Sequence, residues 1–376
     1  MIIKNVKKYT ENCNFEDAEI YIEGERFAGS VTEDASEPVI DGEGAYALPG
    51  LIDLHFHGCI GADFCDGSRE ALEKISAYEA SVGVTTIAPA TMTLPTTELE
   101  QILANAAEYQ KNPAPGADLV GINMEGPFIA MERKGAQNGD FVHKPDAEMF
   151  RELNKASGGI VKLLAIAPEV EGAKECIEEL KDEVVLSVAH TMADYEQAKE
   201  AFEHGVHHVT HLYNAMAGLS HRKPGVVGAA ADDEHVEAEM ICDGVHIHPA
   251  TVRQTFKMFG DDRIIMISDS MEATGMPDGD YALGGQKVIK KGHLATLEDG
   301  TIAGSATNLM DCVRVVVQKM NIPLESAVKC AAVNSAKSVG IYDQYGSITP
   351  GKTANMVLLK EKDLSTKQVI LKGKML

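Results

Sequence analysis

Short apolar runs alternate with amphipathic stretches along most of the chain. Eight runs of apolar or β-branched residues each end in polar residues, and they are LIDLHFHG (51–58), TTIAPATM (85–92), DLVGINMEGP (118–127), IVKLLAIAPE (160–169), VVLSVAH (184–190), HHVTHLYN (207–214), EAEMICDGVH (237–246) and RIIMISDS (263–270). Stretches with a helical period lie between most of them, for example residues 68–83, 192–205 and 248–260. Several of these stretches end in Gly, which commonly terminates a helix. Eight strands that alternate with helices predict a (β/α)8 barrel.

The two ends of the chain show a different pattern, with short extended pieces separated by turns. Residues 1–50 contain MIIKNVKKY, AEIYIEGERFAG and PVIDGEGAYAL, and residues 346–376 contain GSITPGKTANMVLLK and KQVILKGKML. Each segment is too short to bury a core alone, so we expect both ends to pair into one small β-sandwich domain. Residues 276–304 predict β-hairpins inserted after the eighth strand. The predicted fold class is therefore α/β, with a TIM-like (β/α)8 barrel over residues 51–345 and a split β domain.

Composition and charge narrow the classes of function. The 376 residues are 44% hydrophobic, as in an ordinary globular protein, and they carry 34 basic and 57 acidic side chains, a formal net charge of −23. Such a surface repels nucleic acid and anionic membranes, so we expect neither as a partner. We also expect no membrane span, because no apolar run approaches the ~18 residues that a span needs. The seven cysteines are scattered without a C-x-x-C pair, which is typical of reduced thiols and predicts a cytoplasmic protein.

Side chains that can bind metals gather at the ends of the predicted strands. The C-terminal ends of the strands in a (β/α)8 barrel meet at one rim, where active sites lie. A single histidine there is more often a hydrogen-bonded core residue, but this pattern extends over six strands. Imidazole and carboxylate ligands together favour Zn, Fe, Mn or Co, so the sequence predicts a divalent metal site. The polar residues at the strand ends are His55, His57, Glu125, His190, His211, Asn214, Asp243, His246 and Asp269.

The stretch LPGLIDLHFHG (48–58) places His55 and His57 two positions apart. Side chains with this spacing on a strand share a face, which here is the barrel interior. Both imidazoles can therefore reach one cation, and we interpret the pair as metal ligands and not as core residues.

Longer motifs surround the polar strand ends, and they are PGLIDLHFHG (49–58), NMEGPFI (123–129), KGAQN (134–138), SVAHT (187–191), THLYNAM (210–216), ICDGVHIHP (241–249), SDSMEATGMPDGDYALGG (268–285), IAGS (302–305) and GSITPGKTANMV (346–357). Together they resemble the amidohydrolase superfamily and, within it, the family of N-acetylglucosamine-6-phosphate deacetylases. The resemblance covers essentially the whole chain. It implies hydrolysis of the N-acetyl group of a phosphorylated amino sugar, in amino-sugar catabolism and cell-wall recycling.

The resemblance also implies a ligand set. Glu125, His190 and His211 match the principal metal position, where related enzymes use a carboxylated lysine in place of the Glu. His55 and His57 match the histidines that hold a second ion in some members, with the Glu bridging. One or two divalent ions per subunit are therefore expected, with Zn or Fe favoured and Mn or Co as alternatives.

Hydrolysis of an acetamide requires a nucleophile, a polarised carbonyl and a proton for the leaving amine. Asp269 ends the eighth strand. We predict that it is the general base, which takes a proton from water and returns it to the amine, and we also count it among the metal ligands. The other interpretation of Asp269 is a helix N-cap, because SDSMEATG follows a strand.

A donor to the developing oxyanion is needed besides the metal. Some family members place a His after K-G-A, but this chain has the uncharged amide of Gln137, so the role of this position stays open. The resemblance implies substrate contacts at Ala136, Gln137, Asn214, Ala215, His246, Ile302, Ala303 and Gly304.

The substrate phosphate requires local positive charge on this acidic protein. SHRKPG (220–225) offers Arg222 and Lys223. The resemblance implies that Arg222 contacts the phosphate from a neighbouring subunit, and therefore a homodimer with shared sites. The other interpretation of this stretch is a solvated basic turn.

Three other functions remain open from the sequence. A deacetylase for N-acetylgalactosamine 6-phosphate would use the same metal and base and differ at one sugar hydroxyl. A cyclic-amide hydrolase would usually carry the lysine ligand. A barrel without metal, acting as a binding protein, would typically lack several ligands, whereas this chain keeps them all.

Overall fold

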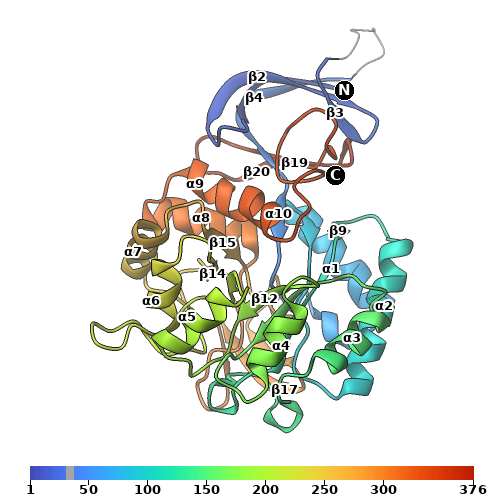
Figure 1. Cartoon of the computed structure of the whole chain (residues 1–376). Coiled ribbons are helices and arrows are strands. Elements are labelled where there is room, and N and C mark those ends of the chain that lie inside the picture. The colour runs from blue at the N-terminus through green and yellow to red at the C-terminus, as the bar shows by residue number, and fades with distance from the viewer. Residues whose placement is uncertain (31–37) are drawn as a thin grey trace.

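A computed structural model of the chain describes residues 1–30 and 38–376. Figure 1 shows a β-rich part built from the blue and red ends of the chain, and a larger part in which strands lie among helices. Residues 31–37, which belong to the first predicted β segment (1–50), lie outside the described residues.

Parallel strands form the centre of the larger part. One three-stranded sheet has the order β5 (Leu51–Asp53), β8 (Val84–Ile87), β9 (Asp118–Leu119). A six-stranded sheet follows in chain order, with β10 (Ile122–Phe128), β11 (Val161–Ile166), β12 (Val185–Val188), β13 (His208–Val209), β14 (Glu237–Ile241) and β15 (Ile264–Ile267). All neighbouring strands in both sheets run parallel. Each of the eight predicted apolar runs therefore contains a strand, and the third run contains two.

Backbone hydrogen bonds extend beyond these strands. The N–H of Thr91 donates to the carbonyl of Asn123 at 2.9 Å, which joins the chain after β8 to β10. On the other side, the N–H of Asp269 donates to the carbonyl of His55 at 2.9 Å, and the N–H of His57 donates to the carbonyl of Ser270 at 2.7 Å. The last strand of the larger sheet therefore continues into a segment that lies beside the continuation of β5.

Helices follow the strands along the chain (Figure 1). Their bounds are α1 (Arg69–Val82), α2 (Thr96–Lys111), α3 (Ala147–Ala156), α4 (Ala173–Leu180), α5 (Tyr195–Glu203), α6 (Gly225–Asp232), α7 (Pro249–Phe259), α8 (Leu309–Met320), α9 (Leu324–Val328) and α10 (Asn334–Ser338). Helix α1 illustrates how the sequence sets these bounds. The Ser68 hydroxyl accepts the N–H of Ala71 and caps its start, and Gly83 ends it with a φ of 97°, a value that favours glycine.

Both chain ends pair in one seven-stranded sheet. Its order is β21 (Lys374–Met375), β20 (Thr366–Leu371), β19 (Met356–Leu359), β4 (Val39–Pro49), β1 (Ile2–Tyr9), β2 (Phe15–Glu23), β3 (Arg26–Ala28). Strand β4 is the junction, because it pairs with β1 in parallel and with β19 from the other end of the chain in antiparallel orientation. One face of this sheet buries its own cluster of apolar side chains, which includes Ile3, Val6, Ile22, Met356 and Ile370.

Two smaller elements lie near the C-terminal ends of the parallel strands. The segment after β15 forms a three-stranded antiparallel sheet of β16 (Gly279–Leu283), β17 (Gln286–Lys291) and β18 (Leu294–Leu297). A short hairpin of β6 (Gly58–Cys59) and β7 (Ala62–Asp63) follows β5. Figure 1 shows β17 at the opposite end of the molecule from the seven-stranded sheet. Within the described residues, no helix is both long and apolar enough to cross a bilayer.

Candidate metal centre

The side chains that the sequence singled out converge beyond the parallel strands. Glu125 lies in β10, and the others follow the ends of their strands. Three of them, His190, His211 and Asp269, have left-handed backbone with φ values of 42°, 28° and 51°. Such backbone costs about 1–3 kcal/mol per non-glycine residue and is retained mainly where the surrounding structure or a function requires it.

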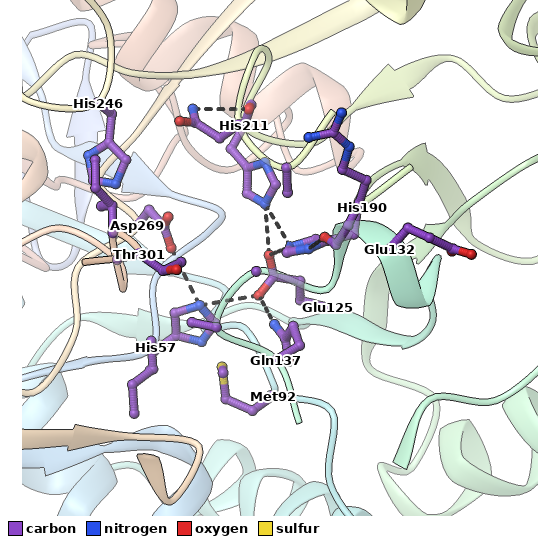
Figure 2. Close-up of a pocket in the computed structure, with 18 residues that line it drawn as sticks. His57, Met92, Glu125, Glu132, Gln137, His190, His211, His246, Asp269 and Thr301 are labelled. Carbon is purple, nitrogen blue, oxygen red and sulfur yellow. Dashed lines mark hydrogen bonds and ion pairs between the residues drawn. The ribbon is translucent and has the colours of Figure 1, made fainter. Parts of the chain in front are cut away.

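Glu125, His190 and His211 form the tightest group (Figure 2). Oε1 of Glu125 lies 3.0 Å from Nε2 of His190 and 2.9 Å from Nε2 of His211, and these two nitrogens are 3.1 Å apart. Nδ1 of His190 lies 2.8 Å from the carbonyl oxygen of Arg133, which can only accept a hydrogen bond, so this nitrogen carries a proton. In a neutral His190 ring, Nε2 therefore presents a lone pair to its neighbours. Lone pairs that converge at this distance favour a shared cation.

His55 and His57 approach the same carboxylate from another side. Nε2 of His55 lies 3.4 Å from Oε1 of Glu125, and Nε2 of His57 lies 3.3 Å from Oε2. Nε2 of His55 has no hydrogen-bond partner among the described residues, although it is buried. Two ligand triplets therefore share Glu125, which joins His55 and His57 in one and His190 and His211 in the other. Within each triplet, the ligand atoms all lie within 4.8 Å of one another. Their buried imidazole and carboxylate donors fit one or two divalent transition-metal ions.

The charged side chains of the site shift one another's pKa values, and the shifts show that the site stabilises positive charge. Burial opposes protonation of His57, but hydrogen bonds with Asp269 and Glu125 raise its pKa to about 10. Burial likewise opposes ionisation of Glu125, but the neighbouring His55, His190 and His211 hold its pKa well below the usual range. Glu125 is thus ionised, and the negative charge around His57 stabilises a positive charge at this position.

Asp269 lies beside the two triplets. Its Oδ1 is 3.4 Å from Nε2 of His57 and 3.8 Å from Nε2 of His55. Burial raises the pKa of Asp269, but the hydrogen bond with His57 and the charges of both histidines outweigh burial and lower it. A carboxylate in this state can accept a proton.

Gln137 occupies a place that the sequence did not reveal. Its Oε1 accepts the N–H of Thr93 at 2.6 Å, which fixes the orientation of the amide. Its Nε2 therefore faces Glu125 and donates to Oε2 at 2.6 Å (Figure 2). The Gln137 side chain is only 2% exposed, so its amide forms part of the wall around the shared carboxylate.

A cavity of about 400 Å³ opens onto these residues. Twelve of the predicted site residues line it, and they are His57, Glu125, Ala136, Gln137, His190, His211, Asn214, Ala215, His246, Asp269, Ile302 and Gly304. The lining does not include His55, which lies behind it, or Ala303, whose side chain is fully buried between two lining residues. Arg222 is exposed in the single chain and lies outside the lining as well.

The sequence missed several residues of this site. Met92, Arg133, Leu283 and Thr301 also line the cavity, and they carry no metal-ligand signature. Asp243, a strand-end residue in the sequence pattern, accepts a hydrogen bond at 2.8 Å from Nδ1 of His246 and so orients that ring.

Glu239 was missed entirely. It is fully buried in β14, where its Oε2 accepts from Nδ1 of His55 at 2.9 Å. The sequence offered no clear signal, because charged and apolar residues alternate at the start of EAEMI, as in a half-exposed strand.

Parallel strands that alternate with helices, with His and Glu side chains gathered at the strand ends, are typical of TIM-barrel-like metal-dependent hydrolases. The chain belongs to the amidohydrolase family, whose model matches residues 46–376, so the resemblance seen in the sequence is confirmed.

Named relatives and solved structures agree with this assignment. The chain is 36% identical to N-acetylglucosamine-6-phosphate deacetylase of Bacillus subtilis (strain 168) over 96% of this chain and 93% of the relative. It is 34% identical to N-acetylgalactosamine-6-phosphate deacetylase of Escherichia coli O157:H7 over 87% of this chain and 86% of that relative. A solved structure of a variant of N-acetyl-D-glucosamine-6-phosphate deacetylase from Mycobacterium smegmatis, in complex with N-acetyl-D-glucosamine-6-phosphate, superposes with a TM-score of 0.91 at 29% identity. It covers 100% of this chain and 98% of that one.

Proposed function

We propose that this protein is an N-acetylglucosamine-6-phosphate deacetylase, which hydrolyses its substrate to D-glucosamine 6-phosphate and acetate. The observation that carries the proposal is the buried Glu125, His190 and His211 triplet at the floor of a 400 Å³ cavity, in a chain that matches such deacetylases over nearly its whole length. A cavity of this size accommodates a phosphorylated monosaccharide.

Glu125, His190 and His211 hold the principal divalent ion in this proposal, and His55, His57 and the shared Glu125 hold a second, optional one. Zn or Fe is favoured by the donor set, with Mn or Co as alternatives. The fit is supported by the converging Nε2 atoms and by the unpartnered buried Nε2 of His55 among the described residues. A divalent ion at this position polarises the acetamide carbonyl and lowers the pKa of water from ~15.7 to about 7.

Asp269 is the general base of the proposed reaction. It accepts a proton from the attacking water, whose oxygen bonds to the acetyl carbon, and it delivers this proton to the sugar nitrogen as the C–N bond breaks. Its lowered pKa supports the first step, because the carboxylate is ionised before the reaction. Nε2 of His57 lies 3.4 Å from Oδ1 of Asp269, and this contact helps to direct the carboxylate toward the cavity.

The remaining cavity residues bind the sugar. We assign contacts to Asn214, Ala215 and His246 on one side and to Ala136 and Gln137 on another, because all of them line the cavity. The backbone of residues 302–304 completes the wall, with Ile302 and Gly304 in the lining.

Arg222 supplies the charge for the phosphate from a second copy of the chain. Its exposure in the single chain supports this arrangement, since an Arg that serves a partner's site must project from its own fold. The protein is therefore a homodimer with shared sites in this proposal, and its seven free cysteines suit a cytoplasmic setting.

The finer architecture is part of the same proposal. We infer that the parallel strands close into a (β/α)8 barrel over residues 51–345, and the hydrogen bonds of Asp269 and His57 with the opposite segment support closure. We also propose that the described parts of residues 1–50, together with residues 346–376, form a β-sandwich. Register shifts within β1 support it, because bulges bend a sheet over its own apolar face.

N-acetylgalactosamine 6-phosphate is the second candidate substrate, favoured by the likeness to the Escherichia coli enzyme. The intact ligand set argues against the alternative of an inactive binding protein. The test is to compare kcat/KM for the two 6-phosphate sugars and for unphosphorylated N-acetylglucosamine. We expect the glucosamine derivative to be preferred and the unphosphorylated sugar to be the poorest substrate. A higher kcat/KM for the galactosamine derivative would replace the first proposal with the second.

A further inference from the structure

Glu239 is a buried charge that the proposed reaction does not use. It lies in the middle of β14, its side chain is fully buried, and it does not line the cavity. Burial of a carboxylate is costly unless the charge is paired and hydrogen-bonded, so its partners indicate its role.

One oxygen of Glu239 serves two partners. Oε2 accepts a hydrogen bond from Nδ1 of His55 at 2.9 Å and another from the backbone N–H of His211 at 3.1 Å. These two histidines belong to different ligand triplets. A single carboxylate oxygen therefore contacts both halves of the candidate metal centre.

The contact with His55 determines which nitrogen of that ring is available. Nδ1 donates its proton to Glu239, so in the neutral ring Nε2 keeps a lone pair that faces Glu125 Oε1 at 3.4 Å. Carboxylates in this position fix the tautomer of a metal-binding histidine and make the ring a stronger ligand.

The contact with His211 acts on the backbone instead. His211 has a left-handed φ of 28°, a strained value for a residue with a side chain. Its N–H is held by Glu239 while its Nε2 lies 2.9 Å from Oε1 of Glu125. The Glu239 carboxylate thus helps to stabilise the strained backbone of His211, which directs the His211 ring toward the candidate metal position.

We propose that Glu239 is a positioning residue that orients His55 through its ring and His211 through its backbone, and so sets the metal affinity of both triplets together. The proposal rests on the proposed function only in taking the triplets to be the metal site. Glu239 touches neither substrate nor ion, and its effect passes through the two histidines.

The test is a titration of metal-free protein with Zn²⁺ against a chromophoric chelator, using Glu239→Gln. Gln keeps the shape of the side chain, but its neutral amide accepts both hydrogen bonds much more weakly than the carboxylate and no longer makes His55 a stronger ligand. We expect metal affinity to fall by about 10- to 100-fold, the range found when carboxylates behind metal-binding histidines are lost. With Co²⁺ in place of Zn²⁺, the visible absorption bands should shift, since they report the ligand geometry.

Glu79→Gln is the matched control. Glu79 is also a fully buried glutamate, but it lies in α1 and neither of its oxygens has a hydrogen-bond partner among the described residues. We expect its metal affinity and Co²⁺ spectrum to match those of the parent protein. An equal loss of affinity in both variants would overturn the proposal, because it would reflect a general effect of replacing a buried glutamate.

Other outcomes are equally decisive. Parent-like Zn²⁺ affinity in folded Glu239→Gln would refute the role of Glu239 whether or not the protein deacetylates a sugar. If Glu239→Gln does not fold, Glu239→Asp keeps the charge but withdraws it from His55, and we expect the same loss of affinity, with parent-like affinity again refuting the role. A parent protein that releases no acetate, together with weakened metal binding in the variant, would remove the proposed function and leave this inference standing.

Discussion

The side-chain amide of Gln137 donates a 2.6 Å hydrogen bond to Oε2 of Glu125, the carboxylate that both ligand triplets share. The backbone N–H of Thr93 fixes the amide in the orientation that makes this contact. Gln137 therefore holds the oxygen of Glu125 that does not face His190 and His211.

Gln137→Glu should disturb this arrangement strongly. It would place two carboxylates at hydrogen-bonding distance, and one of them would have to take up a proton. We expect kcat/KM to fall by about 10-fold or more, together with Zn²⁺ affinity, because hydrogen-bonded partners of ligating carboxylates affect binding on this scale. Asn138→Asp is the control, since its side chain caps the turn Gly139–Phe141 and should tolerate the change. Parent-like metal affinity in Gln137→Glu would show that the amide does not position Glu125.

Asp269→Asn should separate catalysis from metal binding. The amide keeps the size of the side chain but cannot take a proton from water. We expect kcat to fall by about 10²- to 10⁴-fold, the usual contribution of a general base, while the protein still retains an ion. Metal analysis and steady-state kinetics on the same sample would check this. Near-normal turnover would remove Asp269 from the reaction.

Arg222→Ala should raise KM for the 6-phosphate sugar much more than it lowers kcat, because the phosphate lies away from the reacting bond. A mixing experiment tests whether Arg222 acts on a neighbouring subunit. Heterodimers of Arg222→Ala and Asp269→Asn chains would contain one site with both residues intact. We expect such mixtures to regain turnover with a parent-like KM. Activity that merely averages the two variants would place Arg222 in its own subunit's site or outside the site.

Glu79 gives a prediction about stability. Burial raises its pKa well above the ordinary value of 4.5, and the nearby charge of Asp53 adds to the shift. The folded protein therefore keeps a proton on Glu79 that the unfolded chain loses above its ordinary pKa. Stability contributed by this group is present at low pH and falls as pH rises, by about 1.4 kcal/mol per pH unit within the window between the two pKa values.

Glu79→Gln removes that dependence. We expect the difference in free energy of unfolding between variant and parent protein to increase in favour of the variant from pH 5 to ~8. Urea denaturation of both proteins at each pH measures this difference. The same difference between variant and parent at both pH values would mean that Glu79 does not titrate differently in the folded state.

The sequence predicted that these polar residues lie together, because each follows an apolar run, whereas their grouping into two ligand triplets was implied by the family resemblance. In a fold of parallel strands, that position alone places His190, His211 and Asp269 at one end of the sheet. The alternation of strands and helices could also be predicted from the sequence. The structure differs in the third run, which a break divides into β9 and β10. Gly121 lies in this break, where an added Cβ would come within 2.2 Å of the Lys162 side chain.

Contacts between distant segments could not be predicted in the same way. Glu239 looks like a polar position in an alternating strand, and its meeting with His55 joins residues 184 positions apart. Gln137 lies in the KGAQN motif, for which the family resemblance implies substrate contacts, and only its hydrogen bonds with Thr93 and Glu125 show where its amide points. Such roles depend on packing across the molecule, which residue spacing does not encode.

Metal-dependent deacetylation is tested by acetate release from N-acetylglucosamine 6-phosphate, measured with metal-stripped protein and again after Zn²⁺ or Fe²⁺ is restored. We expect equal amounts of acetate and glucosamine 6-phosphate, with activity that disappears on stripping and returns with the ion. Absence of acetate from a metal-replete sample, or full activity in a sample shown to contain no metal, would refute metal-dependent deacetylation by this protein.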